Sequence, residues 1–203
     1  SISMQNHGGY TEKYDNFDEK VRLLGLNYPD VNQYLSLVHE SDSALEYLIS
    51  YFQNVEDPVE IVFFGDHQPS LSSSFYPNLN GKGLSGLTED ELEDLYTIPF
   101  FIWTNYESTE VELPVTSINY LSTLALERAG IELPAYNQFL ADMMETIPAI
   151  NSRGYYSKSA GGFLHIEEAT GEEADWIRNY NILQYNNMFD KKEKSEVFFP
   201  YLK

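Results

Sequence analysis

Two residues with metal-binding side chains, Asp66 and His67, follow the apolar run at 61–64 after a single glycine. This run lies between Pro58 and Gly65, and it is typical of a strand buried on both faces in a parallel or mixed α/β sheet. Ligands of open α/β sheets bind at the carboxyl ends of the strands. A carboxylate and a neutral imidazole suit a divalent metal such as Mn²⁺ or Zn²⁺. The pair is therefore a candidate for two metal ligands; the alternative is a turn-capping aspartate packed against a histidine.

A second polar motif stands near the N-terminus, where the apolar residues 2–4 lead into a loop that contains His7, Gly8 and Gly9. This pattern predicts a short strand that runs into a glycine-rich loop. The imidazole of His7 carries a donor that can meet a phosphate oxygen. The alternative is a loop histidine that is hydrogen-bonded to the backbone.

Four stretches of the chain together resemble one protein family. Residues 63–71, Phe-Phe-Gly-Asp-His-Gln-Pro-Ser-Leu, are similar to the second metal motif of the lipoteichoic acid synthase branch of the alkaline phosphatase and sulfatase superfamily. Residues 4–7 resemble its Met-x-Asn-His segment, residues 98–106 the strand after the metal motif, and residues 183–185 a segment near the end of the catalytic domain. The order and spacing also agree, so the resemblance covers nearly the whole chain.

The resemblance implies an α/β fold, an alkaline phosphatase/sulfatase-like sheet flanked by helices, present here as its C-terminal portion. It also implies that Asp66 and His67 bind a metal, with Mn²⁺ expected first and Zn²⁺, Mg²⁺ or Ca²⁺ as alternatives, and that His7 contacts the substrate headgroup. In this family a metal-bound threonine attacks phosphatidylglycerol, and glycerol phosphate passes to a growing polymer. The threonine and an acidic ligand belong to segments that precede this chain, so no catalytic nucleophile is assigned within it.

The same resemblance implies a place in the cell and a set of partners. The complete protein is expected at the extracellular face of a bacterial membrane, held by N-terminal transmembrane helices absent from this chain, which would itself be soluble. The expected partners are a phospholipid headgroup and a glycerol phosphate polymer. Two alternatives stay open: a sulfatase or phosphoethanolamine transferase, because the superfamily reuses this metal chemistry for other esters, and a binding module without catalysis.

The composition excludes several other classes of function. The net charge of −20 opposes binding to nucleic acid, whose phosphates require patches of Lys and Arg, and it offers no polybasic patch for an anionic membrane. With no cysteine, the chain has neither disulfides nor thiolate metal sites. No apolar run approaches the roughly 18 residues of a membrane-spanning helix. A hydrophobic content of 42% indicates a folded domain.

Periodicity predicts the elements that position these motifs. Strands at 61–64 and 98–103 are expected as neighbours in the centre of the sheet. The expected helices cover 31–53, 89–96 after a capping box at Thr88, 117–129, 136–147 and 171–190.

In the first helix, apolar residues from Val31 to Phe52 form one stripe, and His39 lies on the solvated side. Residues 70–86 are expected as a loop and 151–162 as a connector, while His165 lies in a possible short strand without a role. All 203 residues are expected to form a single domain, with 1–150 as the α/β core and 151–203 as a C-terminal extension.

Overall fold

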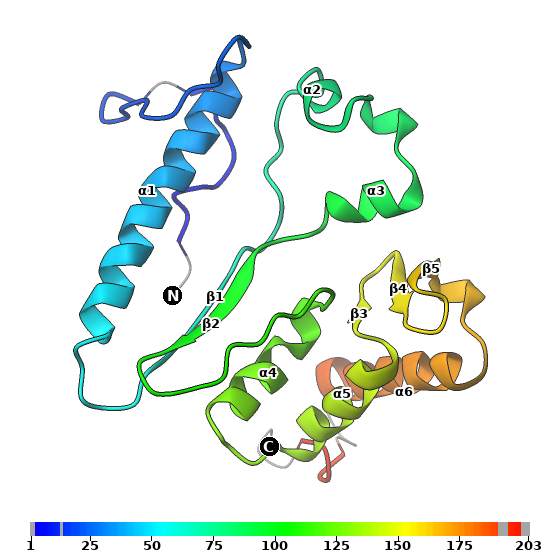
Figure 1. Ribbon diagram of the computed structural model, residues 1–203. Coiled ribbons are helices and arrows are strands. Elements are labelled where there is room, and N and C mark those ends of the chain that lie inside the picture. The colour runs from blue at the N-terminus through cyan, green and yellow to red at the C-terminus, as the bar shows by residue number, and fades with distance from the viewer. Residues whose placement is uncertain (1–2, 13, 191–194, 200–203) are drawn as a thin grey trace. The chain divides into compact units, whose positions relative to one another are not determined.

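The computed structural model describes residues 3–12, 14–190 and 195–199 (Figure 1). The chain forms two compact units, unit 1 at Ser1–Glu107 and unit 2 at Ser108–Lys203. Each unit combines helices with a small antiparallel sheet, so the predicted mixed α/β class is confirmed. None of the helices in the described part of the chain has the length and apolar character needed to cross a bilayer. A single domain with an extension from residue 151 stays a prediction.

The sheet of unit 1 has two described strands, β1 (Glu60–Phe64) and β2 (Phe100–Thr104). They pair antiparallel, with Val62 opposite Ile102. The pairing confirms that these strands are neighbours, but the expected parallel or mixed sheet with β1 buried on both faces is wrong. Phe63 is 37% exposed and Phe64 is 46% exposed. In the described residues β1 has one pairing partner, so much of its apolar surface remains open to solvent.

The connection between β1 and β2 contains three short helices, and Figure 1 shows it as a long loop that extends away from the β1–β2 pair. They are α2 (Tyr76–Asn80), the 3₁₀ turn η1 (Leu84–Gly86) and α3 (Glu89–Asp94). Thr88 and Glu91 form the predicted capping box at the start of α3. The expected loop at 70–86 therefore includes two short helical segments.

The long helix α1 (Pro29–Phe52) confirms the first predicted helix, and proline occupies its first turn, where a missing N–H is tolerated. The predicted apolar stripe is not its buried face. Val31 is buried, but Val38 and Leu48 are exposed. The other buried side chains of α1 are polar and lie in its first two turns; they are Asp30, Asn32, Gln33 and Ser36. These side chains are buried because several of them bind the backbone of neighbouring loops.

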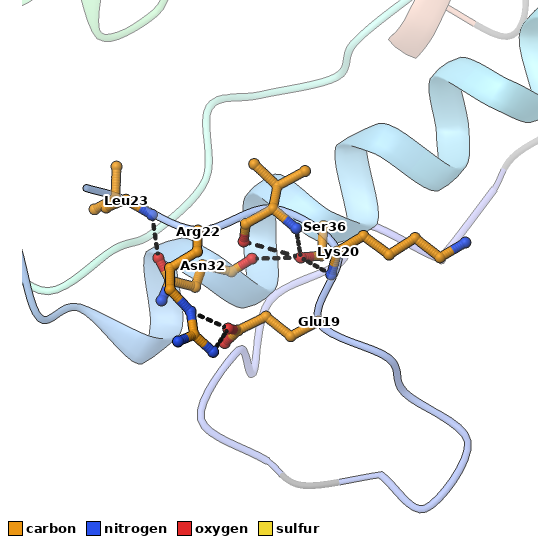
Figure 2. Close-up of polar contacts among 7 residues, drawn as sticks. Glu19, Lys20, Arg22, Leu23, Asn32 and Ser36 are labelled. Atoms are coloured by element: carbon orange, nitrogen blue, oxygen red, sulfur yellow. Dashed lines mark hydrogen bonds and ion pairs between the residues drawn. The ribbon is translucent and has the colours of Figure 1, made fainter.

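Figure 2 shows one such loop, residues 19–23, held against α1 by Asn32 and Ser36. The Ser36 hydroxyl accepts hydrogen bonds from the backbone N–H groups of Lys20 and Val21, both at 3.0 Å. The side-chain oxygen of Asn32 accepts one from the N–H of Leu23 at 2.9 Å. A segment without regular secondary structure thus obtains a defined path along the helix.

Unit 2 contains three α-helices and a three-stranded antiparallel sheet among its described residues. The elements are η2 (Ile118–Tyr120), α4 (Leu121–Arg128), α5 (Ala135–Thr146), β3 (Ala149–Ile150), β4 (Gly154–Ser157), β5 (Gly162–His165), η3 (Ile166–Glu168) and α6 (Gly171–Phe189). The predicted helices are confirmed, and His165 ends a short strand as expected. The connector expected at 151–162 is wrong, because it forms β4 and begins β5. Gly154 is required there, since a Cβ would lie 2.2 Å from the carbonyl oxygen of Leu164.

The hydrophobic core of unit 2 lies among α5, α6 and the strands. Its buried members are Tyr120, Leu140, Met143, Ile147, Tyr155, Ile177 and Tyr180. Residues on both sides of position 150 contribute to this core. The hydroxyl of Tyr120 donates to the carbonyl of Ile147 at 2.6 Å, so the phenol is buried with a partner.

Candidate functional site

The candidate ligands Asp66 and His67 follow the end of β1, as the sequence predicted, and the backbone around them is held to the segment before β2. The N–H of Gly65 donates to the carbonyl of Pro99 at 3.0 Å. The side-chain amide of Gln68 donates to the carbonyl of Thr97. Between these two attachments Asp66 and His67 project into solvent, with side chains 83% and 65% exposed. The pair is thus fixed in its backbone and open at its donor atoms.

The contacts of the pair leave one donor atom of each side chain accessible. One carboxylate oxygen of Asp66, Oδ1, accepts the backbone N–H of His67 at 2.9 Å. The Nδ1 of His67 lies 2.9 Å from the carbonyl oxygen of Gln68. A proton on Nδ1 satisfies this carbonyl and leaves a lone pair on Nε2, an arrangement common in metal-ligating histidines.

The two remaining donor atoms fit a shared cation. Asp66 Oδ2 and His67 Nε2 are 3.7 Å apart. Ligand atoms at about 2.0–2.2 Å from one metal lie roughly 3.0–3.5 Å from each other, so a small movement brings both onto one ion. In the described residues no group of three or more His, Cys, Asp or Glu side chains is placed to hold a metal. This chain therefore presents two candidate ligands, and their role as ligands stays a prediction.

The His7 loop lies on the same unit and is attached to the middle of α1. The hydroxyl of Ser41 donates to the side-chain oxygen of Asn6 at 3.1 Å. The hydroxyl of Tyr10 donates to the carbonyl of Asn6 at 2.6 Å, and its ring packs edge-on against Tyr34 of α1, with centroids 5.4 Å apart. The imidazole of His7 is exposed beside this anchored residue. The strand expected at 2–4 does not form at residues 3 and 4, and residue 2 lies outside the described residues.

Tyr10, three positions after His7, lies within reach of the charge of Asp66. The pKa of the Tyr10 phenol is raised by its burial, by Tyr34 and by the carboxylate of Asp66. Asp66 is therefore within electrostatic range of a side chain three positions after His7. The convergence of His7, Asp66 and His67 on one ligand is consistent with this interaction and stays a prediction.

One residue of this region was missed by the sequence analysis: Asp30, buried in the first turn of α1. Its Oδ2 accepts the backbone N–H of Ser72 at 2.8 Å, in the loop that follows the metal motif. Burial alone would raise the pKa of the Asp30 carboxyl. Hydrogen bonds from Ser72, Val31 and its own backbone lower the pKa by more than burial raises it, so the pKa lies below its ordinary value. In a sequence, an acid in the first turn of a helix is explained by its favourable interaction with the helix dipole. Its position therefore does not reveal that it also makes a tertiary contact.

A sequence model of the sulfatase family matches residues 1–131, which include His7, Asp66 and His67. The chain belongs to the sulfatase family. The match covers unit 1 and continues to the residues after α4, so residues 183–185, which carried part of the resemblance, lie outside it.

Two relatives from Rhizobium meliloti (strain 1021) share sequence with this sulfatase-family chain. A protein named for cyclic beta-1,2-glucan modification is 25% identical over 214 residues, which cover 98% of this chain and 32% of that protein. The capsular polysaccharide biosynthesis protein RkpI is 39% identical over 71 residues, 35% of this chain and 12% of that protein. The chain thus spans about a third of the length of the first relative.

One solved structure has a similar fold, the Streptococcus pyogenes phosphoglycerol transferase GacH in complex with sn-glycerol-1-phosphate. The TM-score is 0.62 at 18% sequence identity, and the similarity covers 91% of this chain and 42% of GacH. At this identity the similarity concerns the fold. It supports a sulfatase-like α/β fold over part of the GacH chain.

Proposed function

We propose that these residues form the C-terminal part of the catalytic domain of an extracellular, metal-dependent phosphoglycerol transferase of the sulfatase family. The observation that carries the proposal is the pair of accessible donor atoms, Asp66 Oδ2 and His67 Nε2, 3.7 Å apart at the end of β1. Family membership and the similarity to the GacH fold support it. The resemblance of residues 63–71 to a metal motif of the lipoteichoic acid synthase branch supports the finer assignment.

In the proposed reaction, a threonine outside these 203 residues attacks the phosphorus of phosphatidylglycerol. A bond forms between the threonine oxygen and phosphorus, and the bond from phosphorus to the diacylglycerol oxygen breaks. Diacylglycerol leaves with the proton that the threonine lost, and glycerol phosphate remains on the threonine. An acceptor hydroxyl then displaces the threonine and gives it back a proton.

The residues of this chain have separate roles in that scheme. Asp66 and His67 hold the divalent cation, with Mn²⁺ as the first candidate, and Gln68 fixes the tautomer of His67 through its carbonyl. When bound, such a cation lowers the pKa of the nucleophile and neutralises charge on the transferred group. His7 donates a hydrogen bond to the headgroup. Transmembrane helices outside this chain hold the domain next to its lipid substrate.

The acceptor has two candidates, a glycerol phosphate polymer and a saccharide. The saccharide is favoured by a specific observation, because the two relatives are named for glucan modification and for capsular polysaccharide biosynthesis. A sulfatase or phosphoethanolamine transferase would use the same two ligands, and family membership alone is compatible with them. The nucleophile distinguishes a sulfatase from the proposed phosphoglycerol transferase, because sulfatases use a Cys- or Ser-derived formylglycine and the proposed transferase uses a threonine.

The test uses the complete natural protein with Mn²⁺ and vesicles that contain fluorescent phosphatidylglycerol. We expect Asp66→Asn to lower diacylglycerol release by about a hundredfold or more, since a metal supplies several kcal/mol of charge stabilisation. Metal content, measured in parallel, should fall as well. The control is His39→Ala, an exposed histidine of α1, which should release diacylglycerol like the natural protein. Full activity in Asp66→Asn, or rapid turnover by the 203-residue chain alone, would contradict the proposal.

A further inference from the structure

The loop after the metal motif and the loop that carries His7 are both attached to α1, at different positions along the helix. The loop after the metal motif is attached at the first turn, where Asp30 accepts the N–H of Ser72 at 2.8 Å. The hydroxyl of Tyr28, next to the helix start, donates to the carbonyl of Ser74 at 2.8 Å and strengthens the same attachment. These contacts bridge sequence separations of 42 and 46 residues.

The His7 loop is attached three turns further along the helix. Ser41 donates to the side chain of Asn6, which directly precedes His7. Asp30 and Ser41 are eleven positions apart, which corresponds to roughly 16 Å along a helix axis at 1.5 Å per residue. A continuous helix of this length is stiff, so the two attachment points keep a constant separation.

Asp30 is suited to this task by its chemistry. Its side chain is buried, and its hydrogen bonds lower the pKa of the carboxyl, so the residue stays ionised at neutral pH. A charged acceptor makes a stronger hydrogen bond to a backbone N–H than a neutral one. The side chain of Asp30 binds the backbone of Ser72 rather than Asp66 or His67, so any effect on the site must act through the loop.

We propose that Asp30 and Ser41 are positioning residues, which use α1 as a rigid spacer to set the separation between the metal motif and His7. The inference rests on the proposed function, because it assumes that one phosphate ester bridges the two motifs. A ligand that spans both motifs binds well only when their spacing is already correct, since binding must otherwise supply the ordering of the loops. Asp30 and Ser41 should therefore affect ligand binding although neither is placed to contact the ligand.

The experiment measures binding of sn-glycerol 1-phosphate to the complete, Mn²⁺-loaded protein by calorimetry, with hydrogen exchange recorded on the two loops. We expect Asp30→Asn to speed exchange at 70–75 and Ser41→Ala to speed it at 5–9. Each variant should raise the Kd about five- to tenfold, the loss expected for one ordering contact. The Kd for Mn²⁺ alone should change less than twofold in Ser41→Ala, because that residue attaches only the His7 loop.

The matched control is Ser36→Ala, which removes the contacts of another buried polar residue of α1 (Figure 2). Ser36 holds residues 20 and 21 and neither motif, so this variant should lose stability and keep the natural Kd for sn-glycerol 1-phosphate. A rise in Kd in Ser36→Ala equal to that in Asp30→Asn would overturn the inference, as would natural binding in both Asp30→Asn and Ser41→Ala. Natural binding in Asp66→Asn would instead overturn the proposed function, so the two failures are distinguishable.

Discussion

The buried side chains of unit 2 are mostly apolar, whereas those of unit 1 are mostly polar. Unit 2 has a contiguous cluster in which Tyr120, Met143 and Ile147 are fully buried. Among the described residues of unit 1 the buried apolar ones are few, namely Tyr10, Val31 and Phe75. Four polar residues of α1 are buried beside them, Asp30, Asn32, Gln33 and Ser36.

This difference indicates that the two kinds of burial do different work: apolar burial stabilises a fold, and polar burial positions its loops. Apolar burial is non-directional and stabilises a fold roughly in proportion to the area removed from water. Hydrogen bonds require defined distances and angles, so they set the path of a loop while adding less net stability. In unit 1, which carries all the candidate site residues, the buried polar side chains position loops by hydrogen bonds. Unit 2 has the larger hydrophobic core and contains none of the candidate site residues.

The largest expected effect compares the same substitution in both units. Leu140→Ala in unit 2 should lower the free energy of unfolding by about 2–5 kcal/mol, because it leaves a cavity at a buried position. Leu48→Ala in unit 1 should cost less than about 1 kcal/mol, since that side chain is already exposed. The chain has two tryptophans, Trp103 in unit 1 and Trp176 in unit 2. Urea titration of single-tryptophan variants therefore reports each unit separately, and equal losses would contradict the comparison.

A smaller effect tests the buried polar residues of α1. Ser36→Ala should destabilise unit 1 by about 1–3 kcal/mol. The N–H groups of Lys20 and Val21 would lose the hydroxyl that accepts their hydrogen bonds, at a position where the side chain is buried. Ser43→Ala is the matched control, since Ser43 is exposed and its hydroxyl donates to the carbonyl of His39 within the same helix. Trp103 fluorescence in a Trp176→Phe background measures both. Equal costs at the two serines would show that the burial of Ser36 and its contacts with Lys20 and Val21 do not matter.

The smallest effect is a pH dependence of unit 1 that originates at Asp30. Its folded pKa lies below the ordinary 3.8, so the contribution to stability is present above that pH and is lost as the pH falls through the lower, folded value. Asp30→Asn should remove this acid-dependent part of the Trp103 unfolding curve while leaving its slope above pH 5 unchanged. An identical acid dependence in both proteins would show that Asp30 does not hold Ser72 through its charge.

Regular features of the fold were predictable from the sequence. The capping box at Thr88 and the apolar runs around Val62 and Ile102 are strong local signals, and the structure confirms a helix start and two strands there. The sheet of unit 2 was missed because its strands are short and two of them begin with a glycine, at Gly154 and Gly162, a residue that ordinarily indicates a turn.

The candidate site was only partly predictable, for a related reason. Asp66 and His67 stand next to each other in the sequence, so their shared position required no knowledge of tertiary structure. The contacts of Asp30 with Ser72 and of Ser41 with Asn6 join residues 42 and 35 positions apart. Hydropathy periodicity treats such polar side chains as solvent-facing, so it misses helix faces that are buried by hydrogen bonds.

The central claim, that Asp66 and His67 are ligands of one divalent metal, is tested most directly by pulsed electron paramagnetic resonance of the Mn²⁺-loaded complete protein. His67 is the one histidine proposed as a ligand, so the spectrum should show nitrogen coupling from a single imidazole. His67→Gln should abolish that coupling, whereas His39→Gln should retain it, since His39 is exposed on α1. Imidazole coupling that persists unchanged in His67→Gln would contradict the account.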